Sequence, residues 1–265
     1  MKRIAGLSDI IADFDAVVTD QYGVLHNGER PYRGARTALE ELAKRGIPVV
    51  TLTNSGKRSA TNAQRLARLG FPKDLVGHVV SSGELARQRL AQLAPGTPVT
   101  LVTRDGETEL IDGLDLRVVS AGGTQQPSMV VLAGVRPEEH TRSDYAQMLG
   151  CYAEHHTRML LVNPDTLMAH GEMVFFGAGA VAEDYAAQGG QVLPLGKPAP
   201  AMFEAALDFL APIPPNRVLM IGDSPEHDIS GARAAGLKTL LIKGGVQSGL
   251  EGGRADYVAD LLDWS

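Results

Sequence analysis

Apolar and polar positions along the chain follow two patterns, one typical of strands and one typical of helices. Short apolar runs at 16–19, 49–52 and 218–221 have the length of buried strands. The segment 35–45 instead places its apolar residues on one face of a helix, and Gly46 supplies a stop signal. Because strand-like runs and helix-like segments alternate, both ends of the chain predict an α/β fold with a parallel sheet covered by helices.

Further elements complete this predicted core. We expect helices at 59–69, 200–210 and 228–235, and a strand at 239–242. The last two helices each feed an apolar run, which is typical of crossovers between neighbouring parallel strands. The predicted core is therefore a doubly wound parallel sheet built from both ends of the chain.

A long stretch separates the two halves of this core. Between Thr53 and Lys197 lie 143 residues, too many for a loop without structure of its own. We therefore expect a core domain at 1–77 and 191–265, with an α/β domain inserted at 78–190. The pattern of the inserted segment predicts strands at 98–102, 117–119, 129–132 and 159–162 and a helix at 145–155.

Polar residues stand where four of the apolar runs end. Asp20, Thr53 and Asp223 each come within two residues of the end of such a run, and Lys197 follows the run 192–195 in the same way. We place all four runs in the core sheet. Because the carboxyl ends of parallel strands meet at one edge of a sheet, we expect these four side chains to converge there.

Four segments in this order resemble the motifs of the haloacid dehalogenase superfamily, and within it the class IIA, NagD-like phosphatases. The segments cover the chain nearly end to end and are Asp20-Gln21-Tyr22-Gly23-Val24-Leu25, Thr53-Asn54, Gly196-Lys197-Pro198 and Gly222-Asp223 with Asp228. The resemblance implies a Rossmannoid doubly wound core with an inserted α/β cap domain. It also implies a phosphohydrolase that acts on a small phosphorylated metabolite.

The resemblance gives each matched residue a role. Asp20 would be the nucleophile that attacks phosphorus and forms an aspartyl-phosphate, which divides one displacement into two easier steps. Lys197 would place a positive charge against the nucleophile and the transferred group. Thr53, Asn54 and Ser55 would bind the phosphate oxygens, helped by backbone N–H groups where the next helix begins.

The same resemblance implies a Mg²⁺ cofactor. Mg²⁺ prefers oxygen ligands and usually takes only one or two carboxylates from the protein. Asp20 and Asp223 would supply these carboxylates, and the backbone carbonyl of Tyr22 would be a third ligand. Asp228 would support the ion directly or through a water molecule.

Tyr22 departs from the family's pattern. At this position the phosphatases carry a second aspartate, the general acid that protonates the leaving group. A phenol, with a pKa of about 10, donates a proton less readily at neutral pH than a tuned carboxylic acid. We therefore expect slow turnover of alkyl phosphates and better turnover of acyl or aryl phosphates. His26 is close enough in sequence to be a replacement proton donor.

Two other hypotheses also fit Tyr22. The pattern Asp-x-Tyr-Gly resembles the first motif of the 2-haloacid dehalogenases, in which the aspartate displaces halide without a metal. That hypothesis leaves Asp223 and Asp228 with no metal to hold, and those enzymes have a small helical cap. The third hypothesis is a non-catalytic protein that binds phosphoesters. Tyr22 favours it, whereas Asp20 and Lys197 speak against it.

Asn163 and Asp165 follow an expected strand of the inserted segment. In the family this region faces the active site, so the resemblance makes both residues candidate substrate contacts. A simple turn is the alternative, because Asn, Pro and Asp are all common turn residues. The sequence leaves both interpretations open.

The composition disfavours several classes of protein. The 265 residues carry a formal net charge of −6 and no basic run longer than a pair, which disfavours nucleic-acid binding. No apolar run approaches the roughly 20 residues that span a bilayer, and the first residues lack a secretory signal. We expect a cytoplasmic protein with no membrane partner. Caps of this kind offer surfaces for self-association, so a homodimer is among the expected assemblies.

Overall fold

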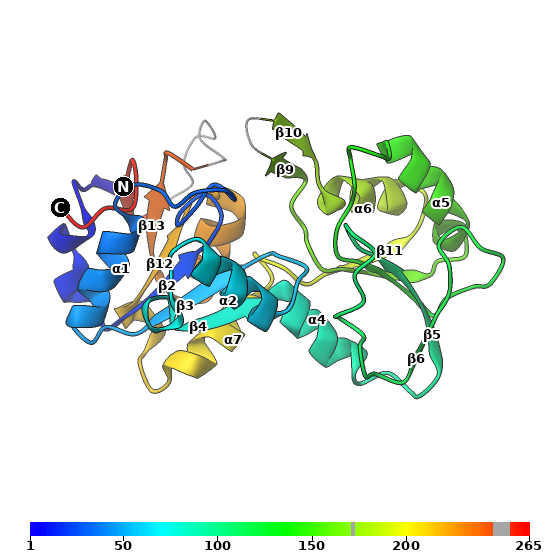
Figure 1. Cartoon of the computed structure of the whole chain (residues 1–265), viewed down its shortest axis with the longest axis horizontal. Coiled ribbons are helices and arrows are strands. Elements are labelled where there is room, and N and C mark those ends of the chain that lie inside the picture. The colour runs from blue at the N-terminus through cyan, green and yellow to red at the C-terminus, as the bar shows by residue number, and fades with distance from the viewer. Residues whose placement is uncertain (171–172, 246–254) are drawn as a thin grey trace. The chain divides into compact units, whose positions relative to one another are not determined.

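The computed structural model describes residues 1–170, 173–245 and 255–265. The chain forms two compact units (Figure 1). The first unit comprises Met1–Thr53, Ala60–Val80 and Lys197–Ser265, and the second comprises Asn54–Ser59 and Ser81–Gly196. Within the described ranges, no helix is long and apolar enough to cross a membrane.

A seven-stranded sheet forms the centre of the first unit. Every pair whose direction the structure defines in this sheet is parallel, as expected for a doubly wound fold. Three adjacent inner strands, at Val218–Gly222, Ala16–Asp20 and Val49–Thr53, are buried along their whole length, which explains their continuous apolar runs. In spatial order the strands are β1 (Lys2–Arg3), β14 (Tyr257–Ala259), β13 (Lys238–Ile242), β12 (Val218–Gly222), β2 (Ala16–Asp20), β3 (Val49–Thr53) and β4 (His78–Ser81).

Helices and short helical turns cover this sheet. The helices are α1 (Ala35–Lys44), α2 (Ser59–Arg68), α3 (Lys73–Val76), α7 (Pro200–Leu210) and α8 (Gly231–Ala234). Single turns lie at Leu7–Asp9, Ile11–Asp13 and Pro215–Arg217. The helix expected at 228–235 begins earlier, as a π-helical turn over Pro225–Ser230 that leads into α8.

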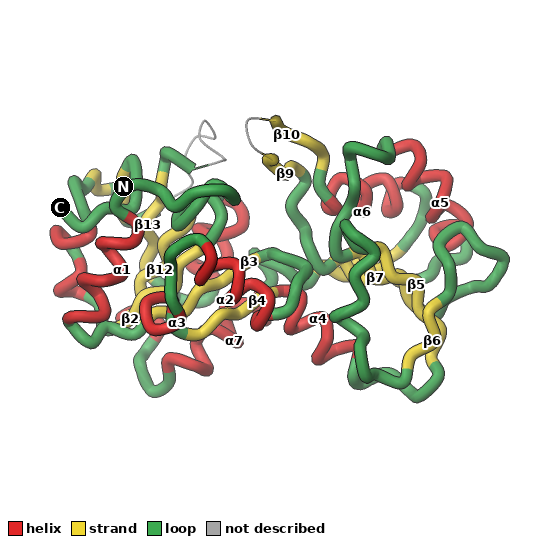
Figure 2. Tube along the Cα trace, in the orientation of Figure 1, coloured by secondary structure: helices red, strands yellow, loops and turns green. Residues whose placement is uncertain are grey.

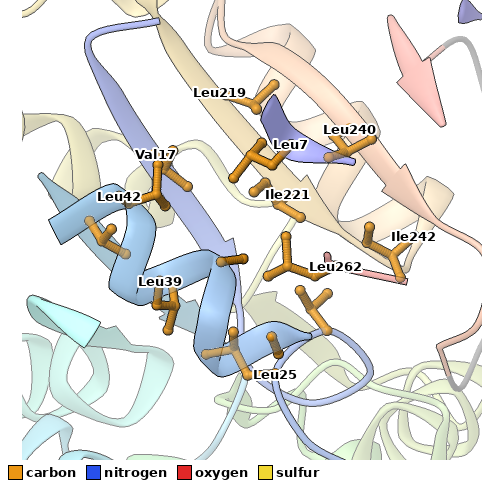
Figure 3. Packing of buried hydrophobic residues seen from close by; sticks show 14 of the residues in the cluster. Leu7, Val17, Leu25, Leu39, Leu42, Leu219, Ile221, Leu240, Ile242 and Leu262 are labelled. Atoms are coloured by element: carbon orange, nitrogen blue, oxygen red, sulfur yellow. The ribbon is translucent and has the colours of Figure 1, made fainter. Parts of the chain in front are cut away.

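Helix α1 packs its apolar face on the sheet. Leu39 and Leu42 lie against Val17 of β2 and near Leu219 and Ile221 of β12 (Figure 3). All five side chains are buried, and burial of each is worth about 1.5–3 kcal/mol. The expected helix at 35–45 is therefore confirmed, and it anchors the strand that ends in Asp20.

A five-stranded parallel sheet forms the second unit, with α5 and α6 packed along it (Figure 2). Leu149 and Tyr152 of α5 and Val181 and Tyr185 of α6 share a buried cluster with Val130 of the sheet. The strands, in spatial order, are β11 (Gln191–Pro194), β8 (Arg158–Leu161), β7 (Met129–Leu132), β5 (Thr97–Val102) and β6 (Leu116–Val118). The helices are α4 (Ser82–Leu90), α5 (Arg142–Glu154) and α6 (Ala178–Ala187), and an antiparallel hairpin joins β9 (Leu167–His170) to β10 (Met173–Phe176).

One expected strand lies in the other sheet. The run 192–195 was expected in the core, but β11 pairs in parallel with β8 of the second unit. The backbone N–H of Leu195 also donates to the carbonyl of Leu161, at 3.0 Å. An apolar run specifies a buried strand without specifying its partner, which is why the pattern misplaced it.

The boundaries of the two units also differ from the expected ones. The second unit begins at Ser81 and ends at Gly196, rather than at 78 and 190, and it includes Asn54–Ser59 as well. The role of this unit as a cap over the active site stays a prediction.

Candidate active site

Strand register brings the expected polar residues to one edge of the first sheet. Asp20 is the last residue of β2, and its neighbour across the sheet is Leu52 of β3. Thr53 therefore lies one residue beyond that pairing. On the other side, Thr19 pairs with Ile221 of β12, which places Asp223 just past the end of its strand. The expected convergence at the carboxyl edge is present.

Lys197 lies at the centre of this group. Its Nζ donates to Asp20 Oδ1 at 2.6 Å and to Asp228 Oδ1 at 2.7 Å. A third hydrogen bond reaches the backbone carbonyl of Leu52, at 3.3 Å. The Lys197 residue is only 3% exposed, so the ammonium group depends on protein acceptors rather than on water. Sequence reasoning predicted the contact of Lys197 with Asp20 and missed those with Asp228 and with the carbonyl of Leu52.

Asp20, Asp223 and Asp228 form a buried carboxylate cluster. One oxygen from each lies within 4.8 Å of the others, and all three residues are less than a tenth exposed. The backbone N–H of Ser224 donates to Asp228 Oδ2 at 3.0 Å, which fixes the carboxylate that also accepts from Lys197. When all three are ionised, three negative charges face one ammonium group.

This excess of negative charge perturbs both partners of the central ion pair. Burial raises the pKa of Asp20 well above its ordinary value, against the charge of Lys197, and the charges of Asp228 and Asp223 raise it further. Burial would lower the pKa of Lys197, but the charges of Asp20 and Asp228 outweigh it and raise this pKa. A hard cation bound by oxygen ligands would relieve the excess. The donor set therefore fits Mg²⁺.

Glycines leave the room that the carboxylates occupy. A Cβ atom on Gly222 would lie 2.2 Å from the Cβ of Asp228, and one on Gly23 would lie 2.1 Å from Asp223 Oδ2. Gly23 also has a φ of +93°, which side-chain-bearing residues rarely adopt. The glycines of the first and last motifs thus have a steric role beside the aspartates.

Tyr22 is half-buried on the loop that follows β2. Its ring packs edge to face with His26, with centroids 5.8 Å apart. A Cβ on Gly28 would lie 3.0 Å from Tyr22 Cε2, so this glycine also accommodates the ring. Burial raises the pKa of Tyr22, against the charge of Arg65, so the phenol is protonated at neutral pH.

His26 does not fit the role of replacement acid. Its Nδ1 accepts from the backbone N–H of Gly28 at 3.0 Å, so the ring proton of the neutral imidazole is on Nε2. Within the described residues that Nε2 is a buried atom without a hydrogen-bond partner. Burial, together with the charge of Arg65, lowers the pKa of His26 to about 4. A neutral imidazole is a very weak acid, so this expectation was wrong.

The segment expected to bind phosphate continues from Thr53 into the second unit. The Asn54 amide donates from Nδ2 to Asp165 Oδ1 at 2.9 Å, and Ser55 Oγ accepts from the backbone N–H of Lys57 at 3.3 Å. Asn163 Oδ1 accepts from the backbone N–H of Asp165 at 3.0 Å, which is the hydrogen bond of an Asx turn. The turn anticipated as the alternative for this segment is therefore present.

Three acidic residues that the sequence did not single out hold the same segment. Glu84 accepts a bidentate ion pair from Arg58, with N–O distances of 3.1 and 2.8 Å. Glu109 accepts from the backbone N–H of Arg58 at 3.0 Å, and Glu107 pairs with Lys57. Each partner is tens of residues away in the chain, so no local pattern could have identified these contacts.

Comparison with known proteins places the chain in a family. Residues 17–117 match the haloacid dehalogenase-like hydrolases, and residues 194–264 match a second model of HAD-hydrolase-like proteins. Human chronophin is 33% identical to this chain, and the alignment covers 98% of this chain and 91% of chronophin. The chain therefore belongs to the haloacid dehalogenase-like hydrolases, and it is a hydrolase of the phosphatase type.

Solved structures agree with this assignment. A haloacid dehalogenase-like hydrolase from Brucella suis 1330 matches with a TM-score of 0.90 at 28% identity, over 98% of this chain and 99% of that one. A glycerol phosphate phosphatase from Mycobacterium tuberculosis, solved in complex with magnesium, has a TM-score of 0.72 at 28% identity, over 94% of this chain and 76% of that one. The expected fold and family are confirmed.

Proposed function

We propose that this protein is a Mg²⁺-dependent phosphohydrolase that cleaves a small phosphomonoester through an aspartyl-phosphate on Asp20. The observation that carries the proposal is the buried ion-pair centre, in which Lys197 donates to both Asp20 and Asp228 beside Asp223. In a salt bridge with a purely structural role, one carboxylate would balance the charge of Lys197, whereas three carboxylates are present here. A third buried carboxylate is costly for folding unless a cation compensates it.

In this proposal the reaction has two displacements. A carboxylate oxygen of Asp20 forms a bond to phosphorus while the bond from phosphorus to the leaving oxygen breaks, and that oxygen acquires a proton. A water molecule then attacks phosphorus, and the bond to Asp20 breaks as inorganic phosphate leaves. Lys197 stabilises the charge on the transferred group, and Thr53, Asn54 and Ser55 bind its oxygens.

Mg²⁺ would be held by Asp20, Asp223, the backbone carbonyl of Tyr22 and Asp228. When bound, it neutralises the charge of the carboxylates and of the phosphate group. The magnesium complex of the related glycerol phosphate phosphatase supports this choice of metal. The backbone carbonyl of Tyr22 is available whatever the side chain, so the departure at this position does not remove a ligand.

Tyr22 would set the range of leaving groups. A general acid typically contributes about 10²- to 10⁴-fold to the rate, and the raised pKa makes this phenol a still weaker acid. We propose that alkyl phosphates react slowly, because an alkoxide must be protonated as it leaves. Acyl and aryl phosphates release stabler anions and should retain most of their rate.

One observation favours a second candidate. The Asp-x-Tyr-Gly sequence at Asp20 resembles the first motif of the 2-haloacid dehalogenases, which use the aspartate without a metal. The buried cluster with Asp223 and Asp228 has no purpose in that reaction. The α/β content of the second unit also differs from the small helical cap of those enzymes. We therefore rank dehalogenation below phosphate hydrolysis.

The test is phosphate release from acetyl phosphate, p-nitrophenyl phosphate and glycerol 3-phosphate, with and without Mg²⁺. It compares the unaltered protein with Asp20→Asn and with Asp208→Asn, which changes an exposed carboxylate on α7. We expect Mg²⁺-dependent release that only Asp20→Asn abolishes. Release that survives Asp20→Asn would refute the proposed nucleophile. Halide release from 2-chloropropionate without phosphate release would select the second candidate, and inactivity in both assays would select a phosphoester-binding protein.

A further inference from the structure

We infer that Asp165 is a positioning residue that fixes the side chain of Asn54 in the phosphate-binding segment, rather than a contact that selects the substrate. The inference deepens the proposed function and rests on it. It starts from the hydrogen bond between Asn54 Nδ2 and Asp165 Oδ1, at 2.9 Å across 111 positions of the chain. Asn54 is only 5% exposed, and Asp165 is half-buried.

The hydrogen bond determines which way the Asn54 amide faces. A carboxylate accepts and cannot donate, so the NH₂ group of Asn54 must face Asp165 and the carbonyl oxygen must face away. That oxygen lies against Gly196, where an added Cβ would be 2.8 Å from it. Gly196 immediately precedes Lys197, so the amide is held at the start of the segment that carries the catalytic ammonium group.

Asp165 is itself held by a rigid turn. Its backbone N–H donates to Asn163 Oδ1, and its carbonyl accepts from the backbone N–H of Gly179, both at 3.0 Å. A Cβ on Gly177 would lie 2.1 Å from the carbonyl oxygen of Asp165, and one on Gly179 would lie 2.2 Å from that of Pro164. The small residues at the start of α6 are therefore required by the close approach of this turn.

The backbone of the segment has separate anchors. The carbonyl of Ser55 accepts from the backbone N–H of Gly83 and from Ser82 Oγ, both at 3.1 Å. Arg58 pairs with Glu84. These contacts order the chain from Ser55 onward, whereas the contact with Asp165 acts on the Asn54 side chain itself. Loss of Asp165 should therefore loosen one amide and leave the segment folded.

A loosened amide should weaken phosphate binding equally for every substrate. Misplacement of a binding group by about 1 Å can cost up to about 10²-fold. We expect Asp165→Ala to lower kcat/KM by about tenfold to hundredfold, and to weaken the binding of inorganic phosphate to the Mg²⁺-loaded protein by a similar factor. Asp165→Asn keeps a carbonyl acceptor for Asn54 and should remain within about threefold of the unaltered protein.

The experiment is a double-mutant cycle of Asn54→Ala and Asp165→Ala. Its readouts are calorimetric binding of inorganic phosphate to the Mg²⁺-loaded protein and kcat/KM with p-nitrophenyl phosphate and with glycerol 3-phosphate. We expect Asp165→Ala to have no further effect once Asn54 is alanine. Asp112→Ala, at an exposed carboxylate of the same unit, is the matched control. If Asp165→Ala does not fold, Asp165→Ser takes its place in the cycle, and Asp165→Asn remains the conservative control.

Two results would overturn the inference. Additive effects of the two alanine substitutions would show that Asp165 does not act through Asn54. A change in KM for one substrate only, with unchanged phosphate binding, would make Asp165 a substrate contact. The phosphate-binding readout needs no turnover, so coupling in that readout from a protein that hydrolyses nothing would support the inference and refute the proposed function.

Discussion

At the scale of single residues, the site is defined by an imbalance between acceptors and donors. Lys197 satisfies one oxygen each of Asp20 and Asp228, and Asp223 lies in the same buried cluster. Burial raises the pKa of Asp20, and the charges of the neighbouring carboxylates raise it further. Tyr22 and His26 beside this cluster are instead uncharged at neutral pH, because one is a half-buried phenol and the other a buried neutral imidazole.

The first prediction concerns the proton that the leaving group needs. Tyr22→Asp should raise kcat/KM for glycerol 3-phosphate by about 10²-fold or more, because a carboxylic acid replaces the phenol. It should change the value for acetyl phosphate by less than about tenfold, because that leaving group needs little protonation. Steady-state kinetics at saturating Mg²⁺ measure both values. Tyr22→Phe is the control, and equal gains on both substrates would contradict the prediction.

The second prediction concerns the pH dependence of stability. The pKa of His26 is about 4 in the folded protein and about 6.5 in an unfolded chain. Between pH 4 and pH 6.5, His26 binds a proton in the unfolded chain but not in the folded protein. The free energy of unfolding should therefore fall as the pH decreases from 6.5 to 4, by about 3 kcal/mol from this residue.

His26→Asn tests this dependence, because its amide oxygen retains an acceptor for the Gly28 N–H while the titrating group is removed. Urea unfolding at pH 7 and at pH 4 gives the free energy of unfolding of each protein. We expect the difference between the two pH values to be about 3 kcal/mol smaller in the variant. An identical pH dependence in both proteins would show that His26 does not titrate as described.

At the scale of elements, two glycines with positive φ differ in what an added side chain would meet. Gly46 follows α1 with a φ of +67° and has no atom within 4 Å of an added Cβ. Gly77 follows α3 with a φ of +61°, and its added Cβ would lie 1.8 Å from the carbonyl oxygen of Val49. Gly77 also has a ψ of −133°, which lies outside the left-handed helical region. At Gly77 an unfavourable backbone conformation and a clash with β3 therefore add together, whereas Gly46 has no clash.

The third prediction compares these two glycines. Gly46→Ala should lower the free energy of unfolding by about 1–2 kcal/mol, which is the cost of the left-handed conformation. Gly77→Ala should cost at least about 2 kcal/mol more, because β3 must move away from the new methyl group and because the backbone conformation at Gly77 strongly favours glycine. Urea unfolding of both variants measures the difference. Equal losses would mean that the turn before β4 adjusts without strain.

Elements that depend on local pattern could be predicted, and elements that depend on partner choice could not. The spacing of Leu39 and Leu42 identified α1, and strand ends identified Asp20 and Asp223 as neighbours. The apolar run of β11 does not indicate which sheet the strand joins. Likewise, Pro225 does not indicate that a π-helical turn begins there. The pairing of Asn54 with a partner 111 positions away leaves no periodic trace in the sequence.

At the scale of the whole molecule, each unit has its own hydrophobic cluster. The chain nevertheless passes between them at four places, after Thr53, Ser59, Val80 and Gly196. Two of these crossings lie beside residues of the proposed site, Thr53 and Lys197. Local stability can differ between such units, and hydrogen exchange reports on each of them separately.

The fourth prediction tests this independence. Tyr185 donates from its buried hydroxyl to the carbonyl of Thr157 at 2.7 Å, and burial raises its pKa to about 12. Tyr185→Phe leaves that carbonyl unsatisfied and should cost about 1–3 kcal/mol. Hydrogen exchange should speed up in α6 and β8 while β2 and β12 keep their protection. Uniform acceleration in both units would show that they unfold as one.

The position of β11 also decides how this protein could be recombined with its relatives. A graft cut at 77/78 and 190/191 would detach β11 from β8 and leave a sheet with a new, unpaired edge. The described division instead requires four splice points, because the short stretch Asn54–Ser59 belongs with Ser81–Gly196. One of these splices falls between Gly196 and Lys197, so a module transplanted into this chain must end directly before Lys197.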